Sequence, residues 1–445
     1  MVRLLRSLGR GVSLLDQLRR AVALDGLAYD PVALHRHQSA QLRRLIRHAA
    51  LRVPFYRDRY HAAGVDPDAV RTIDDLSRLP LVSRADLRSA FPTRLLAEGS
   101  SPADCFLVET TGSTGEPIRL YKDWPALAAF AAWSSPFMVR RWWGVSGLRL
   151  MTLLVRHERS MEQAIVGALP RFLLRVHAAD ALTSPDEQLG EIHRARPDIL
   201  ATYPSVLTTL ATRMLETGAR IPQPQLLATS AEVLDPHARR LIGQAFTGRL
   251  VNLYASTEAG FIAVECLAGR GLHVNSPRVI VEVLNDGRPA APGEAGTVVV
   301  TDLTNFSCPI IRYQGLHDIA RWSPDRCPCG RHFPLLEVVE GRRVDTFVLP
   351  DGRVLHPFTL TLAMEHIPGV TRFQIVQEAV DRVRVLVVPN GRAAPELTTL
   401  VAGEFGRMLG PRVRIDVDAV DTIPAPAGAH WPPTVRSLLV RQQAD

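Results

Sequence analysis

The chain contains almost no lysine. Its 445 residues include 52 lysines and arginines, and Lys122 is the single lysine among them. The formal net charge of +7 therefore comes from arginine, which is spread along the chain and forms no runs interleaved with aromatic residues. Scattered charge of this kind argues against a nucleic-acid-binding protein, because such proteins gather basic residues on one face.

Long apolar runs and paired cysteines are scarce as well. No stretch of about 18 or more apolar residues occurs, so no transmembrane helix is expected. Residues 1–20 are basic and amphipathic but have no continuous apolar core and no cleavage site, which favours a surface helix over a targeting peptide. Five cysteines, an odd number, do not suit a secreted disulfide framework. We therefore expect a cytoplasmic protein.

The order of apolar segments predicts an α/β fold. A helical pattern that includes Leu42 and Leu45 ends near Pro54. Further along, strands alternate with helices, as in a parallel sheet. The expected strands are 149–155, 198–203, 225–230 and 249–254, and the helices between the last three are 205–218 and 235–246.

The pattern changes in the second half of the chain. After residue 275, alternating strands are joined by Asp-Gly and Pro-Gly turns, which indicates antiparallel pairing. The final segment predicts a small α+β domain with a hairpin over 373–387, a helix over 395–409 and a strand over 412–417. We expect no internal repeat.

The stretch TTGSTGEP (110–117) combines hydroxyl side chains with two glycines. A Walker phosphate loop would continue with Gly-Lys-Ser/Thr into a helix, whereas this stretch has Glu116 and Pro117. We expect it to bend back between two strands, so that backbone N–H groups and hydroxyls can bind an anion. A hairpin turn without a ligand is the alternative.

A second motif, NLYASTEAG (252–260), follows a strand at the end where ligands gather in parallel sheets. Thr257 is suited to donate to a phosphate, Glu258 to hold Mg²⁺ and Tyr254 to stack on a base. Taken singly, each of these residues is more often structural.

A third motif spans CPIIRYQGLHDIARW (308–322) and EGRRVDTF (340–347). Asp318 can accept hydrogen bonds from paired hydroxyls such as those of a ribose, and Arg342 can contact the same group. A surface ion pair is the commoner fate of any one aspartate or arginine.

Five motifs occur in order along the chain: TTGSTGEP, SAEVL (230–234), YASTE, RYxxxxD and GRxxD. In this order the chain resembles the adenylate-forming superfamily. More narrowly, it resembles the phenylacetate–coenzyme A ligase-like branch, which includes CapK-like capsule-biosynthesis and F390-synthetase-like proteins. The stretches LRVPFYRDRY, IDDLSRLPLVSRADLR and ATYPSVLTTLA also fit that branch. The resemblance implies an adenylation domain over 1–345, a small mobile domain over 346–445 and a hinge at Asp345.

The resemblance also implies how ATP and Mg²⁺ would be bound. Ala231, Glu232 and Tyr254 would lie against the adenine, and Thr257 and Glu258 would hold phosphate and Mg²⁺. The ATP phosphates would lie in a loop made by Thr110, Thr111, Gly112, Ser113, Thr114 and Gly115.

The ribose and the acid would lie beside these groups. Asp318 would bind the ribose hydroxyls with the help of Arg342, and the acid would lie near Tyr203 and Ser256. The family usually has one residue fewer between the tyrosine and the aspartate of this motif. Either His317 or Asp318 could therefore occupy the ribose position.

A possible metal site is formed by cysteines of two segments. Cys266 and His273 are separated by six residues, and Cys327 and Cys329 lie in a turn-rich segment downstream. Three cysteines and one histidine make a complete tetrahedral zinc set, which predicts a structural zinc ion beside the nucleotide site. Similar cysteines recur in the branch. Buried thiols without a metal are the alternative.

The C-terminal lysine that the superfamily uses in adenylation is missing. In this branch it tends to follow a glycine after an Ile-Pro element, and here Gly428 is followed by Ala429 and His430. Three alternatives remain open. The enzyme adenylates with another cation, for which His430, Arg436 or Lys122 are candidates. It runs a variant ATP-dependent reaction on an aryl acid or amine, such as amide ligation or nitrite activation. Or it binds nucleotide without turnover.

The function we expect is ATP- and Mg²⁺-dependent activation of a carboxylic acid, with an aryl acid favoured, as the acyl-adenylate. The acyl group would then pass to coenzyme A or an amine. A homodimer is left open, and the sequence fixes neither the acid nor the acceptor.

Overall fold

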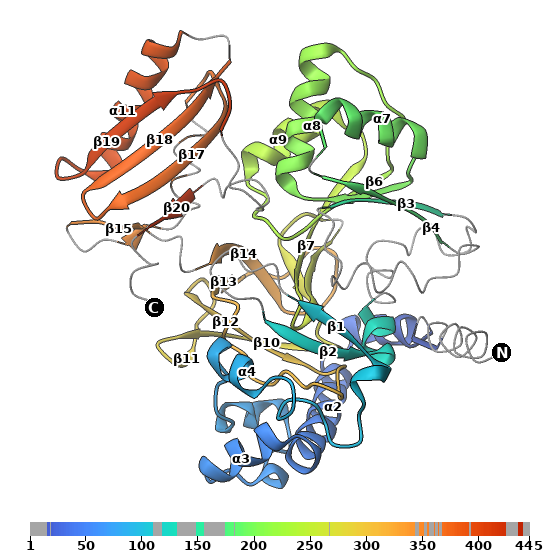
Figure 1. Ribbon diagram of the computed structural model, residues 1–445. Helices are drawn as coiled ribbons and strands as arrows, with labels where there is room; N and C mark the ends of the chain where they lie inside the picture. The colour runs from blue at the N-terminus through green and yellow to red at the C-terminus, as the bar shows by residue number, and fades with distance from the viewer. Residues whose placement is uncertain are drawn as a thin grey trace.

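The computed structural model describes residues 16–17, 19–109, 118–130, 148–154, 174–181, 183–266, 268–342, 347–350, 354–355, 360, 364, 367–390, 393–423 and 435–438 (Figure 1). In this part of the chain, no helix combines the length and the apolar character that a membrane span requires.

One large mixed sheet organises most of the chain. Within the described residues it has twelve strands in the order β11-β10-β12-β13-β14-β9-β8-β7-β6-β5-β3-β4. The parallel strands are β3 (Leu148–Leu154), β4 (Leu174–Asp180), β5 (Ile199–Thr202), β6 (Leu226–Thr229) and β7 (Arg249–Ser256). The antiparallel strands are β8 (Gly260–Glu265), β9 (Leu272–Val274), β10 (Val279–Asn285), β11 (Arg288–Pro289), β12 (Ala295–Asp302), β13 (Asp318–Trp322) and β14 (Leu335–Arg342). Strand β7 runs parallel to β6 and antiparallel to β8, so the sheet changes type at β7.

The predicted parallel half is confirmed, with strand ends shifted by a few residues. Helices α7 (Pro185–Ala195), α8 (Pro204–Thr217) and α9 (Pro236–Ala245) lie together beside its strands (Figure 1). Their starts follow local capping, since Ser184 and Glu187 form a capping box and Asp235 accepts from the N–H of Ala238. The buried core between these helices and the sheet includes Met151, Leu153, Leu200, Leu207 and Ile242.

The antiparallel half packs against N-terminal helices. Helix α2 (Pro31–Arg52) starts at Asp30, whose side chain accepts from the N–H of Ala33. Pro54 does not simply stop a helix, because it opens α3 (Pro54–Ala62), where a missing N–H costs nothing. Helix α4 (Arg84–Ala90) follows. One core joins these helices to the sheet and includes Leu42, Leu45, Ile46, Val283, Val298 and Val300.

The C-terminal segment has its own core, as the sequence predicts. Strands β17 (Val370–Ala379) and β18 (Arg382–Pro389), helix α11 (Ala394–Leu409), β19 (Arg414–Ala419) and β20 (Val435–Ser437) form a four-stranded sheet with one helix. The short pair β15 (Phe347–Val348) and β16 (Val354–Leu355) precedes it. Its buried residues form a separate cluster that includes Ile375, Val383, Val385, Val401 and Phe405. The boundary at Asp345 stays a prediction, since residues 343–346 lie outside the described chain.

Candidate functional site

The YASTE motif forms a tight turn between β7 and β8, where the sheet changes type. The Ser256 hydroxyl oxygen accepts from the N–H of Ala259 at 3.0 Å and closes the turn. Gly260 then has φ 72, in the left-handed region that favours glycine. An added Cβ there would lie 3.1 Å from the Phe130 ring. The turn therefore has a fixed shape that presents Thr257 and Glu258.

The predicted adenine and ribose residues lie together. The Tyr254 hydroxyl donates to Asp318 Oδ2 at 2.6 Å, although the two residues are 64 positions apart in the chain. Asp318 begins β13 and pairs with Arg342 of β14 across the sheet. His317 has φ 60 and precedes the strand. The geometry therefore favours Asp318 over His317 as the residue beside Tyr254.

Glu258 is held from a neighbouring segment. The side chain is only 3% exposed, and its Oε1 accepts from the Tyr313 hydroxyl at 3.2 Å. Tyr313 is fully buried and bridges to Val82 and Val300. A carboxylate fixed in this way offers the kind of oxygen ligand that a hard cation such as Mg²⁺ prefers.

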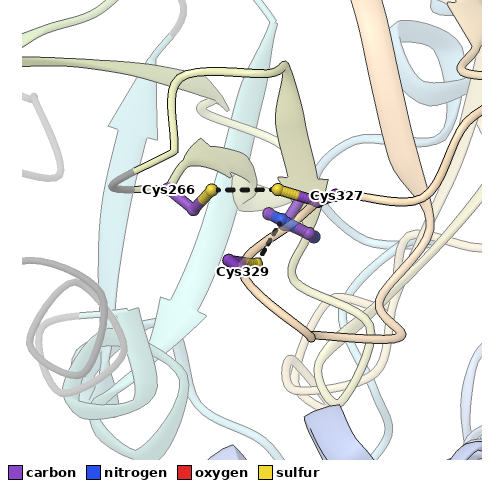
Figure 2. A group of neighbouring side chains, drawn as sticks. Cys266, Cys327 and Cys329 are labelled. Atoms are coloured by element: carbon purple, nitrogen blue, oxygen red, sulfur yellow. Dashed lines mark hydrogen bonds between the residues drawn. The ribbon is translucent and has the colours of Figure 1, made fainter.

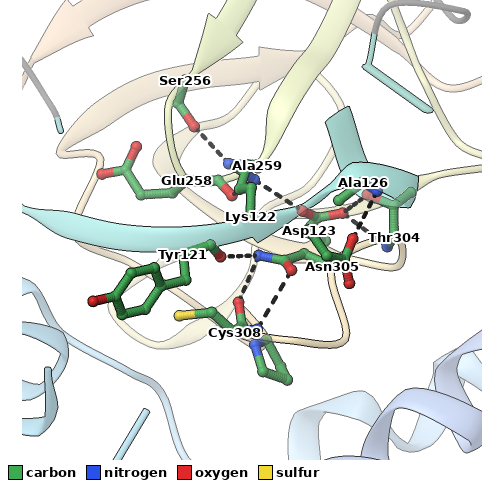
Figure 3. A network of polar contacts seen from close by, with 12 residues as sticks. Tyr121, Lys122, Asp123, Ala126, Ser256, Glu258, Ala259, Thr304, Asn305 and Cys308 are labelled. Carbon is green, nitrogen blue, oxygen red and sulfur yellow. Dashed lines mark hydrogen bonds and ion pairs between the residues drawn. The ribbon is translucent and has the colours of Figure 1, made fainter. Parts of the chain in front are cut away.

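The single lysine lies beneath this turn, as Figure 3 shows. Lys122 is 3% exposed, donates to the backbone oxygen of Glu258 at 2.9 Å and lies 3.4 Å from Asp302 Oδ2. These partners hold the ammonium against the turn. They argue against Lys122 as the substitute for the missing C-terminal lysine, which stays a prediction for His430 or Arg436.

The SAEVL motif directly follows β6. Ala231 is exposed and has φ 69, a conformation that costs an L-residue other than glycine roughly 1–2 kcal/mol. Glu232 is half-buried. Burial lowers the pKa of Arg372 in β17, while the charge of Glu232 opposes this shift, so Arg372 lies near Glu232.

The remaining parts of the predicted site are Tyr203, the stretch 110–117 and His430. Tyr203 is buried at the start of α8, within the core of the parallel half. Strands β1 (Cys105–Glu109) and β2 (Arg119–Asp123) pair antiparallel on either side of residues 110–117, which confirms that this stretch connects two strands. Its residues Thr110 to Gly115 lie outside the described chain, as does His430.

The predicted metal ligands converge. The ligand atoms of Cys266, His273, Cys327 and Cys329 all lie within 4.8 Å of one another (Figure 2). Cys266 Sγ is 3.4 Å from Cys327 Sγ, and Cys329 Sγ is 3.3 Å from His273 Nε2. His273 Nδ1 lies 3.2 Å from the backbone oxygen of Phe333, which leaves Nε2 facing the thiols. The donor set fits a tetrahedral metal with no open position.

Burial favours the uncharged form of both kinds of side chain in this cluster, the imidazole and the thiol. It lowers the pKa of His273, which keeps the imidazole neutral and able to bind a metal. It raises the pKa of Cys327 to about 12. A thiol buried at such a pKa needs a cation to become a thiolate. By contrast, burial raises the pKa of Cys308 to about 12, and among the described residues Cys308 belongs to no group of three or more metal-ligating side chains, which agrees with an ordinary structural role.

Sequence reasoning missed the residues that support the site. Tyr313 belongs to the RYQGLHD motif but was not singled out, and Asp302 carries no motif signal. Lys122 was considered as a free cation and not as a buried anchor. Only its rarity in the chain could have drawn attention to it.

Comparisons with known proteins agree with this geometry. Residues 347–436 match the CapK C-terminal domain. The phenylacetate-coenzyme A ligase of Thermus thermophilus is 26% identical over 356 residues, which cover 76% of this chain and 77% of that protein. A structure of 2-hydroxyisobutyryl-CoA ligase in the postadenylation state has a TM-score of 0.74 at 22% identity, covering 89% of this chain and 86% of that one. The amide bond synthetase McbA from Marinactinospora thermotolerans has a TM-score of 0.54 at 18% identity, covering 75% and 68% of the two chains.

The large mixed sheet and the small α+β domain together have the fold of the adenylate-forming 2-hydroxyisobutyryl-CoA ligase. In sequence, the chain is similar to AMP-forming acid–CoA ligases over about three quarters of its length. It is phenylacetate–coenzyme A ligase-like and carries a CapK C-terminal domain.

Proposed function

We propose that this protein uses ATP and Mg²⁺ to activate a carboxylic acid, with an aryl acid favoured, as the acyl-adenylate, and transfers the acyl group to coenzyme A or an amine. The observation that carries the proposal is the convergence of Tyr254, Asp318 and Glu258 at one end of the sheet. Tyr254 and Glu258 belong to the end of β7 and the turn that follows it, and Asp318 begins β13, 64 positions from Tyr254 in the chain.

In this proposal each end of ATP has its own partners. Asp318, with Arg342, accepts from the ribose hydroxyls, and Tyr254 packs on the adenine beside Ala231 and Glu232. Mg²⁺ would neutralise phosphate charge while held at Glu258, with Thr257 donating to a phosphate oxygen. The hydroxyls and backbone N–H groups of Thr110, Thr111, Gly112, Ser113, Thr114 and Gly115 complete the phosphate site.

The acid would lie near Tyr203 and Ser256, its carboxylate aligned with the α-phosphorus. Alignment and electrostatic stabilisation supply most of the rate, since no covalent enzyme intermediate is needed. His430 is the proposed substitute for the missing lysine, brought to the site by rotation of residues 346–445 about Asp345. We also propose that Cys266, His273, Cys327 and Cys329 hold a structural zinc ion.

A second candidate is a variant ATP-dependent ligase acting on an aryl amine or with nitrite. Two observations favour keeping it: no lysine follows Gly428, and Lys122 is buried. The similarity to an amide bond synthetase also supports an amine acceptor. Nucleotide binding without turnover is the remaining alternative.

The free thiols among the described residues fit the expected cytoplasmic location.

A pyrophosphate-release assay separates these candidates. Purified protein with Mg²⁺ and ATP is given a panel of aryl and alkyl acids, each with and without nitrite. Release that requires only a carboxylic acid supports acyl-adenylate formation, and release that requires nitrite or an amine supports the variant. ATP binding with no release for any acid, amine or nitrite would overturn the ligase proposal.

A further inference from the structure

We propose that Lys122 is a positioning residue that fixes the turn carrying Glu258 and thereby sets the affinity of the site for Mg²⁺. The inference rests on the proposed function, in which Glu258 holds Mg²⁺. Lys122 touches no substrate in this proposal, because its ammonium lies under the turn and not in front of it (Figure 3).

The first support is where the chain places its one lysine. Nearly every basic position is arginine, yet the residue buried beneath the turn is lysine. Burying an ammonium is costly unless it is paired and hydrogen-bonded. Lys122 meets both conditions, through the backbone oxygen of Glu258 at 2.9 Å and Asp302 Oδ2 at 3.4 Å.

The second support is the number of acceptors available. Asp302 Oδ1 already accepts from the N–H and hydroxyl of Thr304, at 2.8 and 2.6 Å. Among the described residues, the acceptors for the cation are Asp302 Oδ2 and the Glu258 carbonyl oxygen. A compact ammonium suits two acceptors, whereas the five donors of a planar guanidinium would be left partly unpaired in this buried space.

The third support is that β2 is itself a fixed frame. Asn305 donates to the backbone oxygen of Tyr121 at 3.0 Å, and the Ser307 hydroxyl donates to Asp123 Oδ2 at 2.8 Å. Both neighbours of Lys122 are thus held to the segment after β12. Strand β2 also leads directly out of the TTGSTGEP stretch. Lys122 therefore ties the Glu258 turn to the hairpin that carries the proposed phosphate loop.

Glu258 is consequently fixed at two points. Lys122 holds its backbone oxygen, and Tyr313 holds its carboxylate at 3.2 Å. Asp302 offsets the charge of Lys122. The same carboxylate also acts on the buried Arg278: burial lowers the pKa of Arg278 to about 10, and the charge of Asp302 opposes this shift. Removing Lys122 frees the turn while leaving the Glu258 carboxylate in the chain, so Mg²⁺ affinity falls before any other property of the site.

The test compares Lys122→Met and Lys122→Arg with the control Asp302→Asn. The control weakens the ion pair but keeps the lysine bond to the Glu258 backbone. At saturating ATP, the Mg²⁺ concentration for half-maximal pyrophosphate release should rise at least fivefold in both lysine variants. It should rise less than fivefold in the control. A smaller rise in Lys122→Met, or an equal rise in Asp302→Asn, would overturn the inference.

A second measurement does not depend on the variants folding or on turnover. Lysine-selective ¹⁵N labelling of the wild type gives one side-chain ammonium signal. That signal should shift on addition of Mg²⁺ and ATP without acid, and stay in place with ATP and EDTA; no shift with Mg²⁺ would contradict the inference. If no acid supports release, ATP binding is measured by equilibrium dialysis at increasing Mg²⁺ concentrations. The Mg²⁺ concentration for half-maximal ATP binding should then rise at least fivefold in the lysine variants. Failure of turnover then counts against the proposed function alone, whereas no Mg²⁺-dependent ATP binding counts against both.

Discussion

Strands β8 and β14 both connect the Cys266 cluster with the candidate nucleotide site. Strand β8 begins at Gly260, just after the Glu258 turn, and ends directly before Cys266. Strand β14 begins opposite His273 and ends opposite Asp318. At about 3.3 Å per residue, the two sites lie roughly 20 Å apart along these strands. These two strands, which lie on either side of β9, therefore have the Cys/His cluster at one end and the candidate nucleotide site at the other.

The two ends differ in what their side chains leave open. At the cluster, three thiols and a fully buried imidazole face one another, so a bound metal would have no position for water or substrate. At the nucleotide end, the Glu258 and Asp318 carboxylates are each held by one tyrosine hydroxyl, from Tyr313 and Tyr254, and oxygen ligands of this kind can bind a cation or a hydroxyl. A closed ligand set stabilises a fold, whereas an open one can bind a substrate. Changes at the two ends should therefore affect different measurements.

The largest effect is expected from Glu258→Gln. Glutamine keeps the size of the side chain and can still accept from Tyr313, but it removes the charge that would hold Mg²⁺. Losing one electrostatic contact of this kind costs about 2.7–4 kcal/mol of transition-state stabilisation, so kcat/KM for pyrophosphate release should fall about 10²- to 10³-fold. The Tm should stay within about 2 °C.

The matched control for that change is Glu98→Gln. Glu98 pairs with Arg57 on the surface, and its side chain is 50% exposed. Exposed pairs contribute about 0–1 kcal/mol, so both kcat/KM and Tm should remain near the wild-type values. A fall of less than tenfold in kcat/KM for Glu258→Gln would contradict the Mg²⁺ role.

The next largest effect is expected at the opposite end, and on stability. Cys327→Ser removes one of four ligands, and Cys105→Ser changes a cysteine outside the cluster. The first variant should lose bound zinc and about 2–4 kcal/mol of stability, a fall in Tm of roughly 4–10 °C. At temperatures well below the Tm, its kcat/KM should fall less than tenfold. The Cys105 variant should keep its metal and its Tm.

Metal analysis of the unchelated wild type decides the zinc proposal itself. About one equivalent per chain is expected. Less than about half an equivalent, with Cys327→Ser and wild type melting at the same temperature, would leave the cluster as buried thiols. If Cys327→Ser instead lost as much kcat/KM as Glu258→Gln does, the two ends would not be separate in function.

An intermediate effect is expected from Asp318→Asn. The amide donates where the carboxylate accepts, so the ribose hydroxyls lose a charge-assisted partner worth about 1.5–3 kcal/mol. KM for ATP should rise about 10- to 100-fold while kcat changes less. Replacing ATP with 2′-deoxy-ATP should weaken binding to the wild type but have little further effect on the variant, because both changes remove the same contact.

The control here is His317→Asn, since asparagine tolerates the φ of 60 found at this position. Its KM for ATP should stay within threefold of the wild type. A larger rise in His317→Asn than in Asp318→Asn would assign the ribose to the histidine and contradict the contact with Tyr254.

The parts of this molecule that sequence could predict are those with local signals. The strands before α8 and α9 follow from short apolar runs, and the Cys/His cluster follows from cysteines in a turn-rich segment that seldom serve as core. The supporting contacts had no such signal. Lys122 and the Glu258 backbone are 136 positions apart, and Tyr313 and Glu258 are 55 apart. Their meeting depends on strand order and register, which residue types alone do not determine.

The smallest effect is expected at Ala231, in the motif proposed to lie against the adenine. Ala231→Gly relieves the cost of φ 69 but adds freedom to the unfolded chain, and these terms of about 1 kcal/mol each nearly cancel. The free energy of unfolding and KM for ATP should therefore change little. Ala231→Val puts a β-branched side chain into the same conformation and should cost about 1–2 kcal/mol more. If the motif lies against the adenine, the valine variant should also raise KM for ATP at temperatures where it stays folded. Equal KM values for glycine, alanine and valine, measured by pyrophosphate release, would place the adenine elsewhere and leave the nucleotide end defined by Tyr254, Asp318 and Glu258 alone.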